Sequence, residues 1–380
     1  MSTARKPLSR RGALAAGTAA VAGGLVWSGS AAAADRPAHL RRPRAGLTPL
    51  QQAGQRVVFS YPGLTPPQSL LDAISAGRVA GVIFFGENIS GLSQISGVVD
   101  RLNEAHRQSP VSSPLLLMTD QEGGLVRRLP GAPVLSEKDV GASADPESAA
   151  RDAGTGAGEN LAGVGMNLNL APVLDVYRKP GDFADQYERS YSSDPAVVGT
   201  LGKDFITAQQ GTGVAATAKH FPGLGAASSS QNTDEGPVTL NVSLSQLRDT
   251  DERPYTSAIS SGVKLVMLSW AVYPALDARL PAGLSPTVVQ QELRGRLGFR
   301  GVTITDALEA GALRNFGGSP ERAVRAAGAG MDLLLCSARD VAQGEGAVTA
   351  LAAALQDGTL DAAAFQAAVQ RVTALRDGLA

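Results

Sequence analysis

Residues 265–306 read LVMLSWAVYPALDARLPAGLSPTVVQQELRGRLGFRGVTITD and contain two short apolar runs separated by a segment of helical length. The runs, Leu265–Trp270 and Val302–Asp306, are nearly continuous in apolar or β-branched residues, as is typical of strands buried on both faces. The amphipathic segment Pro286–Leu297 lies between them, and Ser285 before Pro286 is a common signal for the start of a helix. The stretch therefore predicts a strand, a helix and a second strand parallel to the first.

The same unit recurs along most of the chain. About eight strands alternating with helices predict an α/β fold, a closed (β/α)8 TIM barrel that forms a single domain over residues 47–380. An open doubly wound sheet is the alternative, and the barrel is favoured because polar residues end many strands instead of gathering at one switch point. The further predicted strands are Arg56–Ser60, Val79–Phe85, Leu115–Asp120, Gly165–Val173, Val214–His220 and Asp332–Cys336, and the further helices are Ile95–Gln108, Pro146–Gly163, Pro195–Gln210, Leu244–Ser261, Pro320–Ala329 and Asp361–Gly378.

The N-terminus has the pattern of an export signal. Arg10 and Arg11 precede a weakly apolar run, Ala13–Trp27, and small residues then continue to position 34. This pattern predicts a twin-arginine signal peptide over residues 1–34 and a secreted, extracellular protein. A membrane anchor is the alternative, but the run is short and rich in Gly and Ala. Residues 35–46, rich in Arg and Pro, are interpreted as a flexible leader.

Composition excludes several classes of function. The formal charge of −1 over 380 residues gives no basic excess for nucleic-acid binding, and no later segment is long and apolar enough for a stable membrane span. One Cys allows no internal disulfide, and three His leave little material for a metal centre. Neither a phosphate-binding loop of the Walker type nor a dinucleotide fingerprint occurs. We therefore expect no metal and no cofactor, and a monomer whose partner is its substrate.

Polar residues at the ends of the predicted strands are the candidates for chemistry, because catalytic groups of such barrels lie there. Asp306 ends one strand, and Lys219 with His220 ends another. The alternatives are that Asp306 caps a following helix and that Lys219 and His220 are a buried structural pair. Carboxylate and cationic side chains at strand ends need partners, and a ligand rich in hydroxyls would supply them.

Six motifs carry a resemblance to a known family. Together they resemble glycoside hydrolase family 3, in its single-domain branch typified by bacterial β-N-acetylglucosaminidases (β-N-acetylhexosaminidases), and the resemblance extends from about residue 50 to about residue 336. The motifs occur in this order: DQEGGLVRR at 120–128, NLAPVLDV at 169–176, ERSYSSDP at 188–195, KHFPG at 219–223, YPALD at 273–277 and GVTITDAL at 301–308.

The resemblance implies a retaining exo-β-glycosidase that acts on terminal β-linked sugars of cell-wall or chitin fragments. Asp306 matches the family's nucleophile, which forms a covalent glycosyl-enzyme. Glu122 is interpreted as a support for the turn at Gly123 and Gly124. Residues that match those binding the hydroxyls of the terminal sugar are Asp120, Arg128, Arg189, Lys219 and His220.

The chain departs from the family pattern in the loop after KHFPG. In this branch the loop usually continues His-Gly and then Asp-Ser-His, and the last His is the general acid/base. Here residues 224–236 contain no His, and Asp234 and Glu235 are their only acids. One of these two is predicted to donate the proton, provided that the pocket raises its pKa. The alternative is that both are solvated loop charges.

Two further points stay open at this level. Trp270, at a strand end, is predicted to be a platform for a sugar face, with a core Trp as the alternative. The whole chain could be a catalytically silent sugar-binding barrel that lost its acid, or a glycosidase specific for β-glucosides or β-xylosides.

Overall fold

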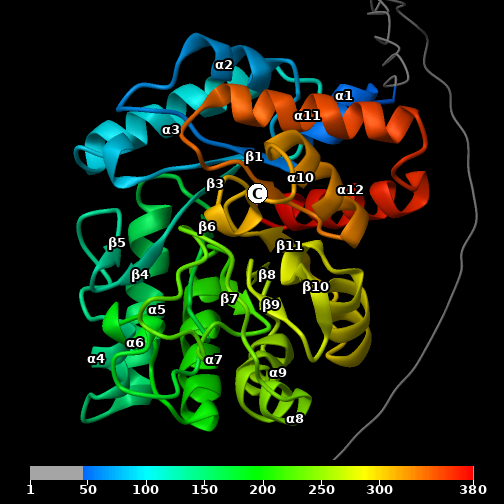
Figure 1. Ribbon diagram of the computed structural model, residues 1–380. Helices are drawn as coiled ribbons and strands as arrows, with labels where there is room; N and C mark the ends of the chain where they lie inside the picture. The colour runs from blue at the N-terminus through cyan, green and yellow to red at the C-terminus, as the bar shows by residue number, and fades with distance from the viewer. Residues whose placement is uncertain (1–45, 380) are drawn as a thin grey trace, which may run out of the picture. The chain divides into compact units, whose positions relative to one another are not determined.

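The computed structural model describes residues 46–379, and the residues from Gly46 onward group as one compact unit (Figure 1). The predicted signal peptide over 1–34 and all but the last residue of the predicted leader over 35–46 lie outside the described residues. Among residues 46–379, no helix is both long enough and apolar enough to cross a bilayer.

Eight parallel strands of the described chain coincide with the eight predicted apolar runs. They pair in the orders β12-β1-β2-β3-β6 and β11-β8-β7. Isolated parallel bridges join Leu168 to Ala215 and Ile304 to Leu333, next to the ends of the two sheets. The fold is therefore α/β, as predicted. The strands are β1 (Val57–Phe59), β2 (Gly81–Ile83), β3 (Leu116–Thr119), β6 (Leu168–Asn169), β7 (Thr217–Phe221), β8 (Leu265–Leu268), β11 (Val302–Thr305) and β12 (Leu334–Leu335).

Both faces of these strands are buried, which explains why the runs are continuously apolar. In β11, Val302 and Ile304 join one core cluster with Met267 of β8 and Leu335 of β12. A second, larger cluster contains most of the apolar residues that the helices contribute. Because successive side chains of a strand point to opposite faces, both clusters take residues from the same strand.

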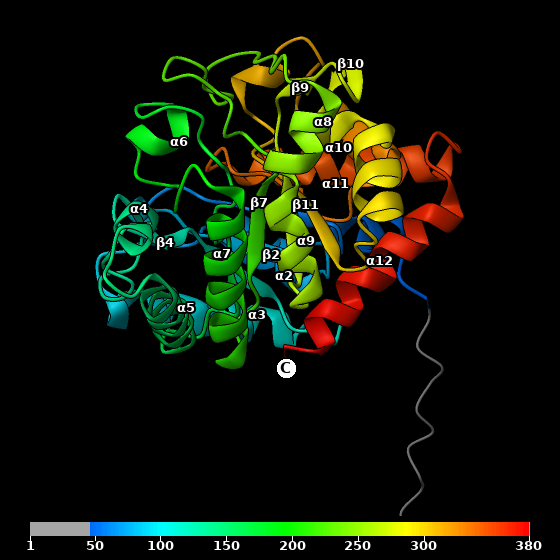
Figure 2. The ribbon, with the colours of Figure 1, turned by 90° about the horizontal axis from the view of Figure 1, so that it is seen from below.

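The helices lie around the outside of the strands (Figures 1 and 2). Asp145 and Asp194, each directly before the Pro that begins a predicted helix, cap two of them by accepting hydrogen bonds from the Ser148 and Ala196 amides. The predicted helix Pro286–Leu297 is helical over Thr287–Arg296, but it is a π-helix, in which each amide bonds the carbonyl five residues earlier. The long helices are α3 (Leu92–Arg107), α5 (Pro146–Ala162), α7 (Pro195–Gly211), α9 (Arg253–Ser260), α10 (Ser319–Ala329), α11 (Val341–Gln356) and α12 (Ala362–Asp377).

Shorter elements follow the C-terminal ends of several strands, and the site is built there. Hairpins follow β3 and β8, and one short helix lies between β6 and α7. These elements are the hairpin strands β4 (Gln121–Gly123), β5 (Val126–Arg127), β9 (Val272–Tyr273) and β10 (Asp277–Pro281), with the helices α2 (Gln68–Ser75), α4 (Glu137–Gly141), α6 (Phe183–Gln186) and α8 (Leu244–Gln246), a π turn (Leu247–Asp251) and the 3-10 turns Gly86–Asn88, Ala282–Leu284 and Gly311–Leu313. Helix α1 (Pro49–Gly54) precedes β1.

Candidate active site

A cavity of about 450 Å³ lies at the C-terminal ends of the strands. Seven of the nine predicted site residues line it, although they come from widely separated parts of the chain. The other two, Glu235 and Trp270, lie outside its lining within the described chain. The seven lining residues are Asp120, Arg128, Arg189, Lys219, His220, Asp234 and Asp306.

Asp306 enters this pocket directly after β11. Its Oδ1 accepts a hydrogen bond of 2.7 Å from the Ala307 amide. In the described chain the next α-helix, α10, begins only at Ser319, so the alternative of a helix cap is wrong. A strand end is rigid, and it therefore holds this carboxylate in a defined position in the pocket.

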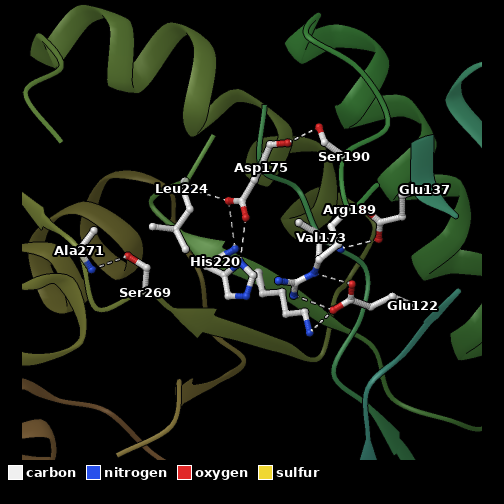
Figure 3. Close-up of polar contacts among 12 residues, drawn as sticks. Glu122, Glu137, Val173, Asp175, Arg189, Ser190, His220, Leu224, Ser269 and Ala271 are labelled. Atoms are coloured by element: carbon white, nitrogen blue, oxygen red, sulfur yellow. Dashed lines mark hydrogen bonds and ion pairs between the residues drawn. The ribbon is translucent and has the colours of Figure 1, made fainter. Parts of the chain in front are cut away.

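Two cations of the pocket share one buried carboxylate, Glu122 (Figure 3). Arg189 binds it through two hydrogen bonds of 2.8 Å, from Nε and from Nη2. Lys219 Nζ lies 2.6 Å from Glu122 Oε1 and 2.8 Å from Asp120 Oδ1. Burial opposes ionisation of Glu122 most strongly, but Arg189 and Lys219 together hold its pKa below the ordinary value. Glu122 therefore orients the two cations.

The interpretation of Glu122 as a support for the glycine turn is wrong. The turn depends on the glycines themselves, since Gly123 and Gly124 have φ of 114° and 50°. A Cβ on Gly123 would also lie 2.1 Å from the carbonyl oxygen of Leu135. Only glycine combines this backbone conformation with so close an approach.

A second buried carboxylate, Asp175, orients His220 (Figure 3). His220 Nδ1 lies 2.8 Å from Asp175 Oδ2, while Asp175 Oδ1 accepts a bond of 2.7 Å from the Leu224 amide. A carboxylate accepts, so Nδ1 carries the proton in this pair, and Nε2 remains for another partner. Lys219 and His220 are thus buried and paired, as the structural alternative stated, and they also line the pocket.

The loop 224–236 places its two acids differently. Both side chains are exposed, but only Asp234 lines the pocket, and Glu235 accepts a bond of 3.1 Å from Asn232 Nδ2. Partial desolvation, and after it the nearby charge of Asp306, raise the pKa of Asp234 to about 6, although the side chain keeps contact with solvent. The positive charges of His220 and Arg189 oppose this rise. Asp234 can therefore donate a proton near neutral pH, whereas Glu235 does not line the pocket.

Backbone contacts hold the Asp234 loop in place. The Gly311 amide donates to the Asp234 carbonyl at 2.8 Å, and the Ala312 amide donates to the Thr233 carbonyl at 2.9 Å. A Cβ at Gly311 would lie 2.4 Å from the carbonyl oxygen of Glu235, so only a glycine permits this approach. The loop is fixed to the turn that follows Asp306.

The prediction that Trp270 is a platform for a sugar face is wrong, because its side chain is only 1% exposed. Its Nε1 donates to the Ala307 carbonyl at 2.8 Å, and its ring would contact a Cβ on Gly283 at 2.5 Å. Trp270 therefore belongs to the core, where it supports the backbone next to Asp306.

The sequence did not identify Glu309 and Arg339, which also line the pocket. Glu309 accepts hydrogen bonds from Ser337 Oγ at 2.6 Å and from Gln343 Nε2 at 2.9 Å, so both its oxygens are engaged. The Arg339 guanidinium lies 4.9 Å from the centre of the Phe85 ring. The position of Glu309 three residues after Asp306 was a usable signal, and Arg339 had none. Within residues 46–379, no three His, Cys, Asp or Glu side chains are grouped to hold a metal ion.

Comparisons with known proteins identify a family and several similar proteins. The family model of the glycosyl hydrolase family 3 N-terminal domain matches residues 50–375. An uncharacterized secreted glycosyl hydrolase of Arthroderma benhamiae is 48% identical over 330 residues, which cover 86% of this chain and 93% of the relative. A beta-hexosaminidase of Stenotrophomonas maltophilia is 34% identical over 274 residues, which cover 70% of this chain and 78% of the relative.

Two solved structures are also similar. A family 3 beta-N-acetylglucosaminidase from a Paenibacillus species superposes with a TM-score of 0.82 at 34% identity over 88% of this chain, which spans only 63% of that protein. A beta-N-acetylhexosaminidase from Beutenbergia cavernae superposes with a TM-score of 0.80 at 34% identity, over 87% of this chain and 99% of that one.

Proposed function

The chain belongs to the family 3 glycoside hydrolases, and we propose that it is an exported, retaining exo-β-glycosidase that removes terminal N-acetylglucosamine from cell-wall or chitin fragments. The observation that carries the proposal is the meeting of Asp306 and Asp234 in one pocket with the cations of the sugar grip. We define the sugar grip as the five residues Asp120, Arg128, Arg189, Lys219 and His220.

The proposal includes a closed (β/α)8 barrel as one domain over residues 47–380. Its support is that parallel pairing follows the order of the strands along the chain. The isolated bridges Leu168 to Ala215 and Ile304 to Leu333 add pairing where the two sheets adjoin. A barrel brings all its strand ends to one rim, as a pocket lined from many strands requires.

In the first step of the proposed reaction, Asp306 attacks the anomeric carbon of the terminal sugar. The bond from this carbon to the leaving oxygen breaks as the Asp306 ester forms, and Asp234 gives its proton to that oxygen. In the second step the Asp234 carboxylate takes a proton from water, whose oxygen attacks the anomeric carbon and releases Asp306. Two inversions at the same carbon give net retention.

The sugar grip orients the substrate for these steps. Lys219, Arg189 and Arg128 donate hydrogen bonds to sugar hydroxyls, and Asp120 accepts them. Glu122 neutralises part of the charge of Lys219 and Arg189, so these cations are not isolated before a sugar binds and need no anionic ligand. The grip therefore binds a neutral sugar.

The choice of N-acetylglucosamine rests on two similar proteins, a beta-hexosaminidase and a beta-N-acetylglucosaminidase, and the alternative is a β-glucoside or β-xyloside. Export rests on the twin-arginine pattern of residues 1–34 and on the secreted relative from Arthroderma benhamiae. Asp234 supports an active enzyme over a silent sugar-binding barrel, because the pocket retains an acid.

A substrate panel tests the proposal. We expect the mature protein to hydrolyse an aryl β-N-acetylglucosaminide faster than the matching glucoside and xyloside, with the β-anomer as first product by NMR. Faster cleavage of another sugar would correct the specificity only. No cleavage even of dinitrophenyl glycosides, whose leaving group needs no protonation, together with measurable sugar binding, would favour the silent barrel.

Gly311→Ala should weaken proton donation without touching the substrate. The added Cβ pushes the loop at Asp234 and Glu235 away, and a displacement of about 1 Å can reduce the rate on the order of 10²-fold. We expect this loss in kcat for substrates with poor leaving groups and a smaller loss for dinitrophenyl glycosides. Gly97→Ala in α3 is the matched control, since a Cβ there meets nothing within 4 Å. Equal kinetics for both variants would contradict the role of Gly311.

A further inference from the structure

We propose that Phe183 and Tyr187 form a subsite for the ring of the leaving-group sugar; this inference rests on the proposed function and names the part of the substrate beyond the bond that is cleaved. The two rings lie 5.2 Å apart at an interplanar angle of 65°. Phe183 lines the pocket, while Tyr187 is 45% exposed. Together they extend an aromatic surface from the pocket outward to solvent.

The position of this aromatic pair relative to the acid indicates which sugar it contacts. The Phe183 amide donates to the Ala227 carbonyl at 3.0 Å, and Gln186 Nε2 donates to the Ser229 carbonyl at 2.9 Å. Both acceptors belong to the loop 224–236, which also carries Asp234. Because the acid protonates the leaving oxygen, the leaving group must lie next to this loop. The aromatic pair is therefore on the leaving-group side.

The segment that carries the pair is held rigidly. The Asp185 carboxylate has two partners: Lys138 Nζ lies 2.7 Å from Oδ1, and the Gly181 amide donates to Oδ2 at 2.7 Å. Glu188, directly after Tyr187, has φ of 58°, a conformation that side chains other than Gly, Asn and Asp rarely adopt. Its amide and carbonyl are both engaged, with Asp185 and with Lys138. A binding surface fixed beforehand loses little entropy when a ligand arrives.

The chemistry of the surface suits a pyranose ring. One face of such a ring presents mainly C–H groups, and burying it against an aromatic ring removes apolar surface of both partners from water. Tyr187 also carries a hydroxyl that can hydrogen-bond to sugar hydroxyls. The pair adjoins the pocket, so its occupant is continuous with the sugar in the grip: it is the second ring of a β-linked disaccharide.

Calorimetry in an inactive Asp306→Asn background tests this subsite, with N-acetylglucosamine and N,N′-diacetylchitobiose as the two probes. Adding Tyr187→Ala should raise the Kd of the disaccharide about 10-fold, an effect typical of one aromatic contact, and should leave the Kd of the monosaccharide unchanged. Tyr187→Phe keeps the ring and should bind the disaccharide like the parent. Leu50→Ala, at a side chain 41% exposed in α1, is the control for the loss of an exposed apolar group.

The outcomes separate the two proposals. If the parent binds both sugars and Tyr187→Ala weakens neither, or weakens both equally, the subsite is overturned while the proposed function stands. If the parent binds neither sugar, the proposed function fails and the subsite fails with it. A loss confined to the disaccharide and rescued by Tyr187→Phe supports the subsite, and it excludes misfolding because the monosaccharide still binds.

Discussion

Asp306→Asn should lower kcat/KM on every glycoside by at least about 10⁴-fold, the order of loss seen when a covalent nucleophile is removed. The amide of Asn is a poor nucleophile, so no glycosyl-enzyme forms. The fold should be retained, because Asn keeps an oxygen that can accept the bond from the Ala307 amide. The measurement is hydrolysis of a dinitrophenyl glycoside, with thermal unfolding of both proteins as the control for folding.

A fluorinated glycosyl donor gives the direct evidence for this nucleophile. It forms the ester rapidly and hydrolyses it slowly, so peptide mass spectrometry should locate the label on Asp306. Glu309 is the informative competitor, because it lines the same pocket only three residues further along the chain. A label on Glu309, or full activity of Asp306→Asn, would overturn the proposed mechanism.

Asp234→Asn should reduce kcat/KM roughly 10²–10⁴-fold on glycosides with poor leaving groups, which is the usual contribution of a general acid. Dinitrophenyl glycosides need no proton in the first step, so for them the loss should appear mainly in the second step, where Asp234 acts as base. Azide, which needs no base, should then restore turnover and give a β-glycosyl azide. Glu235→Gln is the matched control: it removes the adjacent acid, which does not line the pocket.

The pH dependence follows from the raised pKa of Asp234. A carboxyl with a pKa of about 6 is mostly protonated at pH 5 and mostly ionised at pH 7. Only the protonated form donates, so kcat/KM of the parent on poor leaving groups should fall about tenfold per pH unit well above pH 6. This limb should disappear in Asp234→Asn and persist in Glu235→Gln. The reverse pattern would make Glu235 the acid.

The strands could be predicted from the sequence because each is buried on both faces and therefore continuously apolar. β8 and β11 begin at the predicted residues, Leu265 and Val302. Helix α11 was missed because its Ala- and Gly-rich sequence has little amphipathic periodicity, although it packs closely on β1 through Gly344 and Phe59. Hydrophobic periodicity indicates that one side of an element is buried. It fails where small residues give all sides of a helix a similar hydrophobicity.

The direction of a side chain at a strand end could not be predicted from the sequence. Trp270 and Asp306 both follow a strand, yet one enters the core and the other the pocket. Alternate residues of an extended chain point to opposite sides, so a difference of one position in where the strand stops decides between the two. The same limit applied to Asp234 and Glu235. They are adjacent in sequence, and the path of their loop decides that only Asp234 lines the pocket.

By itself, the sequence determined the α/β fold and the order of its strands along the chain, because both follow from neighbouring residues, and its resemblance to family 3 identified Asp306 as the nucleophile candidate. Only the tertiary structure decided that Glu122 joins Arg189 to Lys219, that Asp234 and not Glu235 lines the pocket with Asp306, and that Trp270 is core. The physical reason is that each of these depends on contacts between segments far apart in the chain. The hydrogen bond from the Gly311 amide to the Asp234 carbonyl is a clear example of such a contact, and no local sequence pattern encodes it.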